Sequence, residues 1–170
     1  MLLPSEPTDP RTSHTLHGPP PPDAAELLGL ALRLRHLART DALPLLLRGK
    51  NIGLLRAAAV VQDPAPLLRA ARELGAHVAT VRWNLPGAGD PREVQHTGRM
   101  LGRLYDAVVC QGMAVEAVRR IGQAAGIPVY DDIACGAHPS ARLADDLGDE
   151  AAPGDNRRFV LQAVLVDGLA

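Results

Sequence analysis

Several polar side chains that could bind a ligand follow short apolar segments of this 170-residue chain. If those segments are parallel strands, the polar side chains lie at the carboxyl edge of a sheet, where such sheets bind ligands. Carboxylates and amides suit a neutral or cationic ligand better than a phosphate. The candidate pocket therefore contains Gln62, Asp63, Gln111, Asp131, Asp132 and His138.

The cysteines and histidines do not have the spacing of a metal site. Cys110 and Cys135 are not in a C-x-x-C arrangement, which disfavours a zinc ribbon and a thioredoxin-like motif. The histidines other than His138 show no ligand spacing either. We expect buried, reduced thiols, and neither a metal nor a cofactor.

Short apolar runs alternate with amphipathic segments along the chain. The runs predict strands at residues 50–55, 76–81, 106–110 and 127–130. The amphipathic segments predict helices at residues 23–39, 63–75, 94–105, 114–125 and 138–147. This alternation is typical of the α/β class. It predicts a single three-layer domain with a four-stranded parallel sheet and helices on both faces.

Composition narrows the classes of partner and location. The formal net charge is -1 and only four residues are aromatic (one Trp, two Tyr, one Phe), so a nucleic-acid partner is not expected. No apolar stretch has the length of a membrane span, and no signal peptide is recognisable. We expect a cytoplasmic protein that does not contact a membrane. Residues 1–22 hold seven of the 15 prolines, which predicts a Pro-rich flexible tail.

Five separated segments resemble those of one enzyme family. They are GKNI at residues 49–52, LGAHV at 74–78, TGRMLGRLYD at 97–106, HPS at 138–140 and LAD at 143–145. Similar segments occur in the aspartate and ornithine carbamoyltransferases, the transcarbamylase family. The resemblance implies the fold of the family's carbamoyl-phosphate domain over residues 23–147.

The end of the chain is also similar to this family. Residues 155–166 resemble the last helix of an ornithine carbamoyltransferase, which returns from the amino-acid-binding domain. The resemblance implies that this second domain is missing, that residues 148–154 are a linker, and that residues 155–170 are a C-terminal helix packing back on the domain. By periodicity alone the run FVLQAVLV is ambiguous, and a terminal strand or a new helix is the alternative.

The residues with which the family holds carbamoyl phosphate are nearly all absent. The family grips phosphate with a Ser-Thr-Arg-Thr-Arg loop at a helix N-terminus, which corresponds here to residues 60–64 (VVQDP). Valine offers no side-chain donor, Pro64 at the first helical position has no N–H, and Asp63 is expected to cap the helix. The family's arginine that follows the third strand corresponds to Gln111. His138 is the only site residue of the family that is retained.

These substitutions predict a non-catalytic transcarbamylase-like protein that acts as an oligomeric structural or regulatory partner. The resemblance implies a homotrimer, with a full-length transcarbamylase as a candidate partner. We assign no catalytic residue, and expect His138 to bond the backbone at a helix start. One alternative is a small-molecule binder with a changed ligand in the pocket of Gln62, Asp63, Gln111, Asp132 and His138. Another is aspartate or ornithine carbamoyltransferase-related activity.

Overall fold

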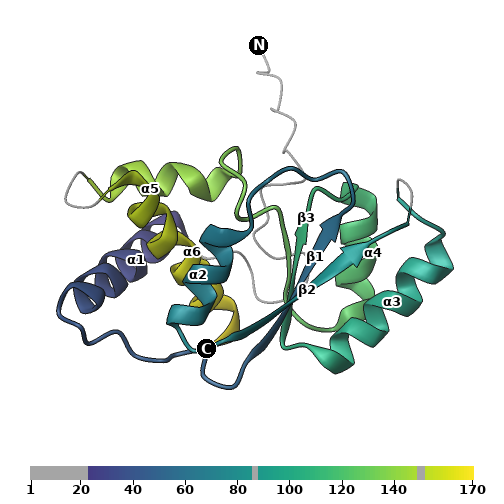
Figure 1. Cartoon of the computed structure of the whole chain (residues 1–170), viewed down its shortest axis with the longest axis horizontal. Coiled ribbons are helices and arrows are strands. Elements are labelled where there is room, and N and C mark those ends of the chain that lie inside the picture. The colour runs from purple at the N-terminus through teal and green to yellow at the C-terminus, as the bar shows by residue number, and fades with distance from the viewer. Residues whose placement is uncertain (1–22, 86–87, 149–151) are drawn as a thin grey trace, which may run out of the picture.

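Four parallel strands form the centre of the structure, a computed structural model that describes residues 23–85, 88–148 and 152–170. They are β1 (Asn51–Ala57), β2 (His77–Trp83), β3 (Ala107–Gln111) and β4 (Val129–Asp131). Their order in the sheet is β2-β1-β3-β4, and every neighbouring pair is parallel (Figure 1). The predicted four-stranded parallel sheet is confirmed. β1 and β3 are interior strands, which explains why both are largely apolar runs.

Helices cover both faces of this sheet, as the alternation of elements predicted. One face is covered by α2 (Ala65–Glu73) and α6 (Pro153–Leu169), with α1 (Ala24–Arg39) packed against α6, and the other by α3 (Pro91–Leu104) and α4 (Val115–Ala125) (Figure 1). Successive side chains of β1 point to opposite faces. Leu54 therefore joins the apolar cluster around α6, while Leu55 joins the cluster under α3 and α4.

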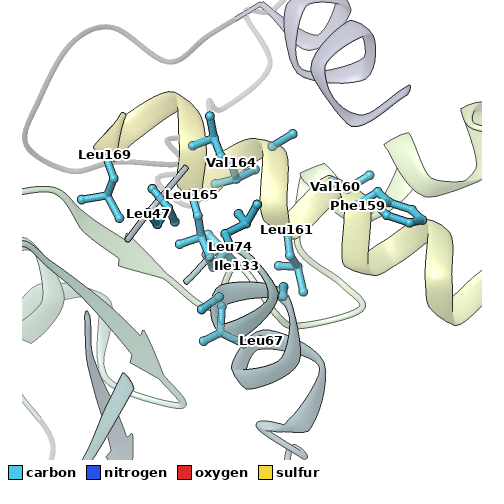
Figure 2. Packing of buried hydrophobic residues seen from close by; sticks show 14 of the residues in the cluster. Leu47, Leu67, Leu74, Ile133, Phe159, Val160, Leu161, Val164, Leu165 and Leu169 are labelled. Carbon is cyan, nitrogen blue, oxygen red and sulfur yellow. The ribbon is translucent and has the colours of Figure 1, made fainter. Parts of the chain in front are cut away.

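The final helix, α6, is buried on almost every side. It packs against α1 and α2, and its apolar side chains lie in the core beside residues such as Leu67, Leu74 and Ile133 (Figure 2). A helix that is apolar all round shows no amphipathic period, which is why periodicity left this segment ambiguous. In this structure the segment is a helix that lies against α1 and α2, where periodicity alone had left a terminal strand as the alternative.

Two helix boundaries differ from those expected. The helix expected at 63–75 is α2, which begins at Ala65; its first backbone bond runs from the N–H of Leu68 to the carbonyl of Pro64. The single helix expected at 138–147 is divided into a 3-10 turn, η2 (Pro139–Arg142), and a short helix, α5 (Leu143–Asp146). The tighter turn follows from the bond of the Ala141 N–H to the carbonyl of His138, three residues back.

The α3 and α4 helices are in very close contact at two glycines of α3, Gly98 and Gly102. A Cβ atom built on Gly102 would lie 1.9 Å from the carbonyl oxygen of Ala125, and one on Gly98 would lie 2.9 Å from the Cβ of Ala124. Because these glycines are four residues apart, they share one face of α3. This face is what allows the two backbones to approach.

Candidate functional site at the carboxyl edge of the sheet

Arg56, near the carboxyl end of β1, organises the polar groups at this edge. Its Nε donates to Oε1 of Gln111 at 2.9 Å, and its Nη2 donates to the backbone carbonyl of Gln62 at 2.5 Å. Gln111 is fully buried, and its Nε2 has no hydrogen-bond partner in the described part of the chain. Sequence analysis missed Arg56. The only available signal was a single charged side chain in an otherwise apolar strand.

The turn that follows β3 is closed by Asp132 and covered by Val60. The backbone N–H of Gly112 donates to Oδ1 of Asp132 at 3.0 Å, and both residues have positive φ, 65° and 49°. A Cβ built on Gly112 would lie 2.7 Å from Cγ2 of Val60. The apolar side chain of Val60 therefore fills the space over this turn, and the Asp132 carboxylate satisfies a backbone donor.

His138 begins the η2 turn and bonds the backbone there. It is 5% exposed; its Nδ1 accepts from the backbone N–H of Ser140 at 3.2 Å and lies 2.8 Å from Ser140 Oγ. Acceptance at Nδ1 favours the neutral tautomer with the proton on Nε2. Both contacts tie the imidazole to its own turn.

Arg157 of α6 connects the final helix to the segment between β4 and η2. It donates to the carbonyls of Ile133 and Cys135, the latter at 3.3 Å, and to Ser140 Oγ at 3.1 Å. Burial lowers the pKa of its guanidinium to about 10, so the group remains a cation at neutral pH. Sequence analysis noted Arg157 only within the segment that resembles the family's last helix.

Asp63 follows Gln62 directly, and its carboxylate is engaged at the start of α2. Its Oδ1 accepts from the N–H of Ala65 at 2.9 Å, so it satisfies a donor at the start of α2, although the helix N-cap is Pro64. It also lines a cavity of about 680 Å³ between α2 and the beginning of α6. Gln111, Asp132 and His138 do not line that cavity. The structure thus links Gln62 and Gln111 through Arg56, with Asp132 at the adjacent turn, whereas the Asp63 carboxylate bonds the start of α2.

The two thiols are not bonded to each other, and they differ in burial. Cys110 is fully buried, and burial, reinforced by the carboxylates of Asp131 and Asp132, raises the pKa of its thiol. Cys110 and Cys135 are not joined by a disulfide. Among residues 23–85, 88–148 and 152–170, no cluster of three His, Cys, Asp or Glu side chains could hold a metal ion. No helix in the same ranges is long and apolar enough to cross a membrane.

Comparison with known proteins identifies relatives of this chain. No protein-family profile matches the chain. An ornithine carbamoyltransferase of Cutibacterium acnes is 32% identical over 121 residues, which is 71% of this chain and 36% of that enzyme. This chain is a partial homologue of the transcarbamylases. It spans less than half the length of the curated transcarbamylases that it matches.

Solved transcarbamylase structures agree with this assignment of the fold. The ornithine carbamoyltransferase of Pyrococcus furiosus matches with a TM-score of 0.61 at 20% identity, over 74% of this chain and 40% of that one. The catalytic subunit of aspartate transcarbamoylase from M. jannaschii matches with a TM-score of 0.59 at 20% identity, over 74% of this chain and 41% of that one. The α/β fold with a parallel sheet is therefore that of part of a transcarbamylase.

Sequence analysis predicted that residues 60–64 correspond to the family's phosphate loop, and the structure shows which contacts these residues make. Val60 packs on Gly112, Val61 is 96% exposed, and Gln62 contributes its carbonyl to Arg56. Asp63 occupies the start of α2 with a carboxylate, where a free helix N-terminus would attract an anion.

Proposed function

We propose that this chain is a non-catalytic transcarbamylase-like protein that acts as an oligomeric structural or regulatory partner in the cytoplasm. The observation that carries the proposal is the conformation of residues 60–64. Val60 fills the turn after β3, and the Asp63 carboxylate accepts from the Ala65 N–H. An anion bound at this helix start would meet a like charge instead of donors.

The side chains that surround these residues support the same proposal. Two of the three guanidinium nitrogens of Arg56 already donate to Gln111 and Gln62, and Nδ1 of His138 is engaged by Ser140. Groups that hold internal hydrogen bonds must give them up before they can bind a ligand, and lost hydrogen bonds to charged groups cost about 1.5–3 kcal/mol each. These hydrogen bonds therefore stabilise the fold at the positions where transcarbamylase chemistry would take place.

A changed ligand in the pocket of Gln62, Asp63, Gln111, Asp132 and His138 has less support. Asp63 lines the cavity between α2 and the beginning of α6, and none of the other four residues lines it. The Asp132 carboxylate satisfies the Gly112 N–H, and the carbonyl of Gln62 is bonded to Arg56. This alternative stays a prediction.

We expect no carbamoyl transfer by the purified chain. Incubation with carbamoyl phosphate and either ornithine or aspartate should form no more citrulline or carbamoyl-aspartate than a heat-denatured sample does, because residues 60–64 offer no phosphate clamp. A full-length ornithine carbamoyltransferase serves as the positive control. Product above the denatured control that scales with protein concentration would overturn the non-catalytic assignment and support the carbamoyltransferase alternative.

We expect this protein to be an oligomer in solution. The resemblance implies a trimer, and two exposed apolar side chains of α3, Met100 and Leu104, are available for contact with another subunit. Light scattering should give a mass near three times the 18.0 kDa of one chain. A mixture with a full-length ornithine carbamoyltransferase tests the partner hypothesis. A chain that remains a monomer both alone and in that mixture would contradict the proposed role as a partner.

A further inference from the structure

A cavity of about 570 Å³ lies between β2, at the edge of the sheet, and helix α3. Apolar side chains from β1, from β2 with the segment that follows it, and from α3 line this cavity: Leu55, Val81, Trp83, Leu85, Met100 and Leu101. Leu55, Trp83 and Leu101 belong to the apolar cluster under α3 and α4. The cavity is therefore on the face of the sheet opposite to α2 and α6.

Charged side chains that line the same cavity are not used within the described part of the chain. Arg82, Arg92 and Glu93 are exposed, and their side chains make no hydrogen bond or ion pair with another residue of the ranges 23–85, 88–148 and 152–170. Both arginines lie where β2 ends and α3 begins. Two cations and one anion leave an excess positive charge at this end, which favours an anionic group there.

Trp83 adds a hydrogen-bond donor to the apolar lining. The residue is 7% exposed, and its Nε1 is buried without an acceptor in the part of the chain that the structure describes. The N–H of a buried tryptophan usually has a partner, so this donor is an exception. An oxygen atom of a bound ligand would give it an acceptor.

We infer that this cavity binds a small carboxylic acid with an apolar body about the size of one aromatic ring. The apolar body would cover Trp83 and Leu101, and the carboxylate would lie toward Arg82 and Arg92. An apolar lining with a few polar groups that fix orientation is typical of small-molecule sites, and the volume is in their range. A small, fully polar anion such as phosphate is disfavoured, because the apolar lining cannot replace its water.

This site is separate from the groups on which the proposed function depends. None of its lining residues belongs to residues 60–64, and Arg56, Gln111 and His138 do not line it. Met100, which is assigned to a subunit contact, is not among the residues proposed to hold the ligand. The inference goes beyond the proposed function, because binding here requires neither carbamoyl transfer nor a partner.

Fluorescence of Trp83 reports directly on this cavity, because it is the only tryptophan of the chain. Titration of the full chain with 3-phenylpropionate should change the emission saturably, with a Kd below about 1 mM. The neutral 3-phenylpropionamide should bind about fivefold more weakly or worse, since it loses the charge-assisted interaction. Acetate, which lacks the apolar body, should give no saturable change over the same concentrations.

Two variants test the role of the arginines. Arg82→Ala and Arg92→Ala should each reduce the preference for the acid over the amide by about threefold or more. Both residues are exposed, so both variants should fold normally. Arg103→Ala is the matched control, because Arg103 is an exposed arginine of α3 outside the cavity and its replacement changes the net charge equally. It should leave both affinities within about twofold of those of the unmodified chain.

Three results would overturn the inference. They are the absence of a saturable emission change with 3-phenylpropionate, equal affinity of the unmodified chain for the acid and the amide, and a preference that Arg103→Ala reduces as much as Arg82→Ala and Arg92→Ala do. None of them depends on the carbamoyl-transfer assay or on the oligomeric state, so failure of this inference is distinguishable from failure of the proposed function.

Discussion

Removal of residues 153–170 is expected to leave the rest of the chain unfolded at 25 °C. These residues form α6, whose side chains Phe159, Val160, Leu161, Val164, Leu165, Val166 and Leu169 are all buried in the cluster shown in Figure 2. Burial of a large apolar side chain stabilises a fold by about 1.5–3 kcal/mol. The loss is on the order of 10 kcal/mol, which equals the whole stability of an ordinary domain.

The polar contacts of α6 add to this loss. Arg157 would no longer bond the carbonyls that follow β4, and Glu73 of α2 would lose both Arg158 and Gln162. Far-UV circular dichroism with urea denaturation measures the effect. A truncated chain that still unfolds cooperatively, with a midpoint close to that of the full chain, would contradict the assignment of α6 to the core.

A graded version of this experiment uses single leucines. Leu161→Ala, at a fully buried position of α6, should lower the free energy of unfolding by about 2–5 kcal/mol. Leu45→Ala, at an exposed position before β1, should change it by less than about 0.5 kcal/mol. Similar losses for the two variants would mean that α6 does not pack as described.

Gly102→Ala is expected to lower the free energy of unfolding by about 2 kcal/mol or more. Its new Cβ would lie 1.9 Å from the Ala125 carbonyl oxygen, and a backbone atom cannot move aside as a flexible side chain can. The α3 and α4 helices would have to separate along the face that carries Gly98 and Gly102. Added volume in a tightly packed region costs about 1–3 kcal/mol and occasionally more.

Gly29→Ala is the matched control for this substitution. Gly29 also lies within a helix, α1, but a Cβ built there would have only the end of the flexible Arg33 side chain at 3.7 Å. Because alanine is the better helix former, this variant should be more stable by about 0.5–1 kcal/mol. Thermal unfolding of both variants should therefore shift in opposite directions. A stabilised Gly102→Ala variant would show that the two helices are not in such close contact.

Local patterns in the sequence were sufficient to predict most of the secondary structure. Asp23 caps α1 as its position before an apolar-periodic segment indicated, and Gly126 ends α4 in the left-handed conformation that favours glycine. The end of β1 was harder to predict from the sequence. It continues through Arg56 to Ala57 because both residues pair with β2, whereas the apolar run ends at Leu55. That pairing depends on a strand far along the chain.

The candidate site was predicted only in part, because its residues were chosen for their places after the strands. This reasoning found Gln111 and Asp132, which do lie close together at the carboxyl edge, through Gly112. It also grouped Asp63 with them, although that carboxylate bonds the start of α2 and lines the cavity between α2 and α6. Position along the chain identifies the edge of the sheet, but not the direction in which a side chain leaves it.

By itself, the sequence determined the order of strands and helices and the α/β class, since these follow from periodicity and from the types of residue in each segment. Only the tertiary structure decided which groups meet. Arg56 bonds Gln111, 55 residues away, and Arg157 bonds Ile133, 24 residues away. Such contacts depend on strand order and on helix packing, and these are set by burial of the whole core rather than by any local segment.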